Sequence, residues 1–499
     1  MMPARKEEPV LGTLIQKELK AMTLSPKFIA TFSVCSFLLI MSVIIGINEY
    51  KQAVTQYETV HQLANERLNQ VSTWRSVTYR EHRKPSPLQI FTSGLSYDIG
   101  RWSNIDTEST IKMKNSIYSD DPIFAVFRIL DFTFIVQIVF SLLAILFTFD
   151  AINGEKESGT LRLVFSNAVS RTKYILAKCI GSWLGLMIPV IIPILISILL
   201  VMLFGIPFTG TEWIRLFLII VSSLLYLTFF VVFGVFISTL SKRSSVSFLF
   251  SLVLWIAFVL IIPRGGVVAA GHVVSVPRLG EIEGLRDAYS KNKWEAYYKE
   301  SEERWRNRSI SDTDPDSEGD EEGGIDEGEM WAQMQEEQAM RKAVTTDIEN
   351  YEAMLLEDLK NKQRVQQNLG FILSRFSPAA TYQLAVMTLS NTDLNMKSTY
   401  EEALADYRTQ FNNYVEEKSA NSGPGAGAVM ITMDSESGFN LQMGRENAID
   451  VSDRPVFTHP VVALGQILPD VMINIAILLL MTLAVLIGAY YSFIRYDLR

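Results

Sequence analysis

Apolar residues in this chain of 499 residues gather into long runs, and highly charged blocks separate the runs. Six runs approach or exceed the roughly 20 residues that a helix needs to cross a hydrocarbon core of about 30 Å. This pattern predicts an all-α polytopic membrane protein with six transmembrane helices. The predicted spans are residues 28–47, 124–149, 180–204, 213–240, 246–262 and 471–493.

Basic residues near the spans predict which side of the membrane each short segment faces. The short loop IPFTGTE between the third and fourth spans contains neither Lys nor Arg. Four other segments carry basic residues: the leader 1–27, the stretch 150–178, the turn SKRSS and the tail 494–499. The positive-inside rule therefore predicts that both termini are cytoplasmic. Residues 48–123 and 263–469 then form two extracytoplasmic insertions.

The leader contains a short amphipathic pattern directly before the first span. Its apolar face is formed by Leu11, Leu14, Ile15 and Leu19, and the charged residues between them point elsewhere. We predict a helix that lies in the inner leaflet of the membrane. The alternative is a plain helical leader without a membrane contact.

The two insertions are predicted to be mainly helical. Tyr400, Leu404, Tyr407, Phe411 and Tyr414 repeat at heptad spacing, which is typical of a packed core. A similar pattern after the first span suggests that its helix continues outward. His61 falls within that seam and is interpreted as a packing residue.

Charge is concentrated in the second insertion. The net charge of −9 comes largely from an acidic tract within residues 312–329, so we do not expect a nucleic-acid partner. The tract is predicted to be a disordered linker because it combines low hydrophobicity with high charge. An EF-hand loop is the alternative, but Ser317 and Gly323 stand where that loop needs Gly and Glu.

No catalytic motif is evident. The chain has four histidines, and none has ligand spacing to another histidine or to a cysteine. The stretch GVVAAGHV imitates a phosphate-binding loop, but His272 replaces its lysine. We expect no catalytic residue, no cofactor and no metal, so the chain is not predicted to be an enzyme.

One ionic pair is predicted inside a span. Arg128 and Asp131 are one helical turn apart near the outer end of the second span. Ionisable residues within a membrane are functional candidates. The alternative is a neutralising pair at the level of the headgroups.

The stretch 150–178 is polar, although spans precede and follow it. Asn153 and Gly154 favour a turn, and Ser158, Gly159 and Ser170 offer further breaks or helix caps. We predict one or two short helices that are rigidly joined to the second and third spans. A charged loop that only sets the topology is the alternative.

The same stretch, FDAINGEKESGTLRLVFSNAVSRTKYILAK, resembles the motif of ABC-2 type transporter permeases. The matching positions are Asp150, Gly154, Glu155, Lys156, Glu157, Gly159, Thr160, Leu161, Ser166, Ser170, Arg171 and Lys178. The leader IQKELK resembles the elbow helix of that family. SRFSPAA and FIRYDLR resemble the subgroup with a large extracytoplasmic insertion before the last span, the DUF3526-type permeases.

The resemblance implies a permease subunit in a bacterial or archaeal inner membrane. It implies a second permease subunit, in a homodimer or a heterodimer, two cytosolic ATPase subunits, and transport in the direction of export. The residues implied in coupling to the ATPase are Asp150, Gly154, Glu155, Glu157, Gly159, Thr160 and Arg171. A membrane-anchored assembly scaffold that acts through its outer helices is the rival interpretation. A secondary transporter is disfavoured because no inverted repeat is evident.

Overall fold

The computed structural model describes residues 10–71, 74, 77–105, 113, 130–166, 169–311, 327–421, 429–434, 438–443 and 450–495. The chain divides into two compact units. The span unit comprises Met1–Ile262 and Arg375–Arg499, and the hairpin unit comprises Pro263–Ser374. Each is described by itself.

The described residues include five helices that are long and apolar enough to cross a membrane, which confirms the all-α polytopic class. They are α2 (Pro26–Leu68), α9 (Arg171–Leu203), α10 (Gly210–Leu240), α17 (Leu464–Ile494) and the continuous run of α11 (Ser244–Ile256), η4 (Ala257–Ile261) and α12 (Ile262–Val273). The second predicted span contributes a shorter apolar helix, Phe132–Leu146. It consists of α5 (Phe132–Phe134), the π-helix η3 (Ile135–Phe140) and α6 (Ser141–Leu146), and residues 124–129 lie outside the described part.

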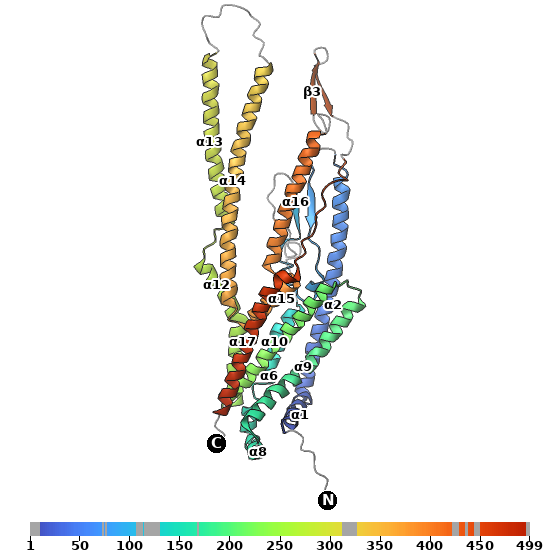
Figure 1. Cartoon of the computed structure of the whole chain (residues 1–499), viewed down its shortest axis with the longest axis vertical. Coiled ribbons are helices and arrows are strands. Elements are labelled where there is room, and N and C mark those ends of the chain that lie inside the picture. Colours follow the sequence, from blue (N-terminus) through green and yellow to red (C-terminus); the bar gives the residue numbers. More distant parts are fainter. Residues whose placement is uncertain are drawn as a thin grey trace, which may run out of the picture. The chain divides into compact units, whose positions relative to one another are not determined.

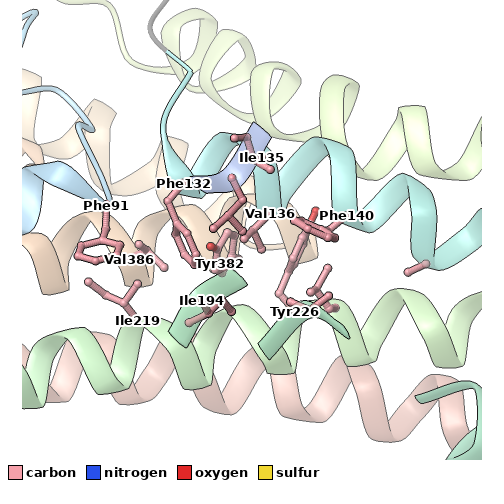
Figure 2. Close-up of a cluster of buried hydrophobic side chains, with 14 of the residues drawn as sticks. Phe91, Phe132, Ile135, Val136, Phe140, Ile194, Ile219, Tyr226, Tyr382 and Val386 are labelled. Carbon is pink, nitrogen blue, oxygen red and sulfur yellow. The ribbon is translucent and has the colours of Figure 1, made fainter. Parts of the chain in front are cut away.

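The central element of the span unit is α10, which contacts α6, α9, α15 and α17 (Figure 1). Thr209 and Glu212 begin this helix with a capping box, in which each side chain bonds the backbone amide of the other residue. Its buried face is rich in aromatic residues. Figure 2 shows the surrounding core, in which the ring of Tyr226 stacks on that of Tyr382 with centroids 4.6 Å apart.

Tyr382 belongs to α15 (Pro378–Ser390), which the sequence placed within the second insertion. Ser377 caps the start of α15, and Asn391 ends it in the left-handed conformation with φ of 57°. The hydroxyl of Tyr382 lies 2.9 Å from that of Ser223 on α10. The helix therefore packs into the same core as the spans, which the sequence did not predict.

A second core lies where the continuation of α2 meets α16 (Leu394–Asn421) and a small sheet. The sheet pairs β1 (Tyr79–His82) with β2 (Trp102–Ile105), antiparallel, with Tyr79 opposite Ile105. The heptad prediction for α16 is confirmed, because Tyr400, Leu404, Tyr407 and Phe411 are buried there. Apart from the helices within residues 150–178, the remaining elements of the unit are α1 (Val10–Thr23), η2 (Pro87–Ile90), β3 (Val429–Asp434) and β4 (Gly438–Met443).

The hairpin unit consists mainly of α13 (Leu279–Ser311) and α14 (Glu327–Ser374), which pair with each other. The rings of Tyr289 and Tyr351 stack with centroids 4.0 Å apart, and Lys293 pairs with Asp347 at 2.5 Å. Residues 312–326, most of the predicted acidic linker, lie outside the described residues. The disorder predicted for that tract stays a prediction.

Candidate functional site

The polar stretch between the second and third spans forms α7 (Asn153–Glu157) and α8 (Thr160–Ser166), as the turn and cap residues predict. Gly159 joins the two helices with a positive φ of 74°, which a residue with a Cβ adopts only under strain. The hydroxyls of Ser158 and Thr160 both donate to the carbonyl of Glu155 at 3.2 Å. These bonds close the last turn of α7 and fix the start of α8.

Glu155 lies in an ionic cluster that we call the charge quartet, formed with Lys17, Glu18 and Lys178. Lys178 on α9 is 4% exposed, and its Nζ lies 2.9 Å from Glu155 Oε1 and 2.8 Å from Glu18 Oε1. Lys17 Nζ is also 2.9 Å from Glu155 Oε1. The quartet therefore ties α7 to both α1 and α9.

The electrostatic balance at Glu155 favours its ionised form. Burial alone would raise the pKa of this carboxyl, but the charge of Lys178 and the hydrogen bonds from Tyr174, Lys178 and Lys17 lower it to about 2. The Tyr174 hydroxyl donates to Glu155 Oε2 at 2.6 Å. Glu155 is thus a charged anchor at neutral pH.

Close packing of α1 on α9 supports the quartet. Two glycines one turn apart on α9, Gly181 and Gly185, face α1. A Cβ added at Gly181 would lie 2.6 Å from Glu18 Cβ, and one added at Gly185 would lie 2.7 Å from Met22 Sδ. The two helices therefore approach each other more closely than side chains at these positions would allow.

Glu157 connects α7 to α11. Its carboxylate accepts hydrogen bonds from the backbone amide and the hydroxyl of Ser244, at 2.9 and 2.8 Å. Asn153, which is fully buried, accepts from the hydroxyl of Ser238 on α10 at 3.2 Å. Asn153, Glu155 and Glu157 together thus connect α7 to α1, α9, α10 and α11.

Arg171 joins the beginning of α9 to the end of the last span. Its guanidinium donates to the carbonyl of Ile494 near the end of α17. The negative end of the helix dipole also stabilises a cation in this position. The ring of Tyr174 stacks on that of Phe493 with centroids 5.3 Å apart. A small apolar core that includes Ile152 and Leu161 lies beside this contact.

The outward surface of α8 differs from that of α7. Leu163 is 67% exposed, and Arg162 is exposed beside it. The surface of α8 therefore presents an exposed apolar side chain beside an exposed basic one.

The predicted site residues fall into two groups. Glu155, Glu157, Gly159, Thr160 and Arg171 come together in the segment just described. Asp150 and Gly154 form the second group. They are four residues apart, and the Gly154 amide donates to the Asp150 carbonyl at 2.9 Å.

The predicted ionic pair in the second span is described only in part. Arg128 lies outside the described residues. Asp131 caps α5 by accepting from the Phe134 amide at 2.7 Å, and its other oxygen accepts from the Ser93 hydroxyl at 2.8 Å. The structure thus gives Asp131 a capping role, and its pairing with Arg128 stays a prediction.

Sequence reasoning missed Lys17, Glu18, Tyr174, Ser238 and Ser244, and it missed the role of Lys178. The available signal was the position of Lys178, a lysine within a strongly apolar helical run. A cation there requires a buried anionic partner or exposure to water. The partners themselves are too distant in sequence to be identified from spacing.

Replacing Gly159 by Ala should lower the stability of the protein by about 1 kcal/mol. The cause is the positive φ alone, because a Cβ at this position would meet nothing within 4 Å. Gly154→Ala is the matched control: it lies in α7, and its Cβ would meet Asp150 Cβ at an ordinary 3.4 Å. Thermal unfolding in detergent measures both, and equal losses would contradict the strain argument.

The fold and this segment together define a polytopic membrane protein in which a rigid polar segment joins two spans. Among the described residues, no group of three or more His, Cys, Asp or Glu side chains could hold a metal ion. The model of a family described as ABC-2 family transporter protein matches residues 13–498, so the chain belongs to this family. No curated protein matches the chain. Family membership makes the chain a membrane component of an ABC transporter system.

Proposed function

We propose that this chain is the permease subunit of an ABC exporter and that a separate cytosolic ATPase drives it. The observation that carries the proposal is the internal bracing of α7, combined with the exposed surface of α8. A segment that receives force from a partner needs both features: a surface to contact and rigid connections to the spans.

The contacts of α7 suggest how force on α8 reaches the spans. Glu155 transmits it to α1 and α9, Glu157 to α11, and Asn153 to α10. Arg171 extends the connection to α17. This assigns the two glutamates a bracing role within the permease, while α8 contacts the ATPase.

The finer features of the proposal rest on the positive-inside rule and on the family resemblance. The α7–α8 end faces the cytoplasm with both termini, because the basic residues gather there. Two permease subunits pair and bind two ATPase subunits in a bacterial or archaeal inner membrane. Residues 374–380 and the C-terminal tail support the subgroup with a large extracytoplasmic insertion, the DUF3526-type permeases.

The proposal is tested by Leu163→Glu, which places a charge on the exposed surface of α8. Binding of the ATPase should weaken at least about tenfold, because burying an unpaired charge in an interface costs several kcal/mol. Co-purification with the co-expressed ATPase measures this. Leu63→Glu on α2 is the matched control. Leu63 is also exposed, but it lies near the C-terminal end of α2, in the predicted extracytoplasmic insertion.

Retention of the ATPase by the Leu163→Glu variant at the wild-type ratio would exclude α8 as the docking surface. Failure of the wild-type chain to bind any ATPase encoded beside it would favour the scaffold interpretation instead.

A further inference from the structure

A second cluster of titratable side chains lies in the core formed by α2, β1, β2, α16 and the segment 451–461. Its centre is Glu81 on β1, which is 2% exposed. In the described part of the chain, its Oε1 atom has no hydrogen-bond partner. An ionised carboxylate in this position would be costly, so its protonation state is tied to the packing around it.

His459 lies opposite Glu81, with its Nε2 3.9 Å from Glu81 Oε1, which is too long for a hydrogen bond. Tyrosine hydroxyls occupy both ring nitrogens: Tyr57 lies 2.8 Å from Nε2 and Tyr400 lies 3.2 Å from Nδ1. Tyr400 donates its own proton to the carbonyl of His82 at 3.2 Å, so its oxygen accepts from Nδ1. The network therefore places a proton on Nδ1, and in the neutral imidazole Nε2 then accepts from Tyr57.

With this tautomer, an ionised Glu81 would face the lone pair of Nε2. Burial raises the pKa of Glu81 to about 7, against smaller opposing effects from the His82 backbone, the Tyr79 hydroxyl and the charge of Arg454. Burial lowers the pKa of His459 to about 4, and neighbouring Lys84 and His61 lower it further. The geometry and the surroundings agree that the pair holds its proton on Glu81.

The other titratable groups near the pair are Arg454, Tyr407, His82, His61 and the charged Lys84. Arg454 donates to Asn65 on α2 at 2.6 Å, and its guanidinium lies 5.6 Å from the centre of the Tyr79 ring. Tyr407 on α16 donates to the carbonyl of Pro455 at 3.0 Å. Burial lowers the pKa of the His82 imidazole on β1 to about 4.

These contacts also hold the segment 451–461 in place. Pro455 is bonded to α16, Arg454 to α2, and His459 to both helices. The segment ends directly before α17, which begins at Leu464. What fixes the segment therefore also restrains one end of the last span.

We propose that Glu81 and His459 form a pH-responsive latch that docks the segment 451–461 on α2, β1 and α16. The latch is closed while Glu81 is protonated and His459 is neutral. Loss of the Glu81 proton leaves a buried carboxylate against the unprotonated Nε2, and the segment then undocks. The latch is independent of the ATPase partner proposed above.

The two groups act in opposite directions with pH. Glu81 has a folded pKa above its ordinary value of 4.5, so its contribution is complete below that value and is lost as pH rises through about 7. His459 has a folded pKa below its ordinary 6.5, so its contribution is complete above that value and is lost as pH falls through about 4. The closed latch is therefore favoured between these limits.

Hydrogen exchange of the full chain in detergent, followed by mass spectrometry, tests the latch. The probes are the backbone amides of residues 79–82 and 451–461, corrected for intrinsic exchange. Glu81→Gln keeps the side chain at position 81 neutral, so the docked form does not lose stability as pH rises through about 7. The opening constant of the wild type relative to E81Q should therefore rise roughly 70-fold between about pH 5 and about pH 8. Glu58→Gln, an exposed change on α2, is the control and should show no such dependence.

An opening ratio that stays constant with pH would overturn the proposal. So would an E81Q protein that does not fold, because the neutral side chain is assigned to the docked state. Infrared spectroscopy provides a second readout: the band of a protonated carboxyl that E81Q lacks should titrate near pH 7 in the wild type. A midpoint at the ordinary value for Glu would also overturn it.

Discussion

Lys178→Ala should lower the free energy of unfolding by about 3–5 kcal/mol and uncouple α7 from α1 and α9. Lys178 is the shared cation of the charge quartet, and without it Glu18 and Glu155 are left with Lys17 alone. Removing one member of a buried ionic network leaves uncompensated charge, which accounts for the size of the loss. Chemical or thermal unfolding in detergent measures the stability.

Lys173→Ala is the matched control, since Lys173 lies on the same helix but is exposed. Its loss should change stability by less than about 0.5 kcal/mol. Near-equal effects of the two substitutions would show that the quartet contributes little. Hydrogen exchange of α1 should rise in the Lys178 variant alone, because that helix loses its main ionic contact with α9.

The same variant has a pH signature. In the wild type the pKa of Glu155 is depressed to about 2, so its stabilising contribution is present above its ordinary value and is lost as pH falls through about 2. Lys178→Ala removes the charge that lowers the pKa of Glu155 most, so burial raises the pKa of Glu155 in the variant above its wild-type value. The stability gap between wild type and variant should then narrow as pH falls, because Glu155 of the variant takes up its proton at a higher pH than Glu155 of the wild type.

Gly234→Ala should lower stability by about 3 kcal/mol, although alanine normally favours a helix over glycine by about 1 kcal/mol. Gly234 lies in α10, and a Cβ there would be 1.9 Å from Thr148 Oγ1 and 2.9 Å from Thr148 Cβ. Thr148 lies at the end of the second predicted span, directly before the polar stretch 150–178. Alanine at position 234 would therefore push α10 away from the residues that lead into α7.

Gly210→Ala is the control for this substitution, because it lies in the same helix and its Cβ would meet nothing within 4 Å. It should leave stability unchanged or raise it. The double variant Gly234→Ala, Thr148→Ala should recover part of the loss, since it removes the closest clashing atom. Unfolding temperatures in detergent distinguish these cases, and a neutral Gly234→Ala would contradict the close approach.

The spans could be predicted from sequence because the membrane selects long apolar runs, whatever their neighbours. The helix α15 could not, because its 13 residues are too few for a span and its polar Ser377 and Asn391 resemble loop residues. Its burial depends on the rings of Tyr226 and Tyr382 meeting across 156 positions of sequence, which no local pattern encodes.

The candidate site shows the same division. The turn at Gly159 and the two short helices followed from residue types that favour breaks and caps. The contacts of the glutamates did not, since an acidic residue in a polar loop looks equally suited to contact with a partner protein. Only the positions of Lys17 and Lys178, 138 and 23 residues from Glu155, show that this carboxylate is turned inward.

The separation of Lys17 from Glu155 by 138 residues has a consequence for biosynthesis. At about 5–20 residues per second, Glu155 leaves the ribosome roughly 7–28 s after Lys17, and Lys178 follows later still. During that interval the charges of α1 have no partner from the α7 segment. We therefore expect the charged side chains of the leader to stay hydrated during that interval, and α1 to be fixed to α9 only after Lys178 has been synthesised.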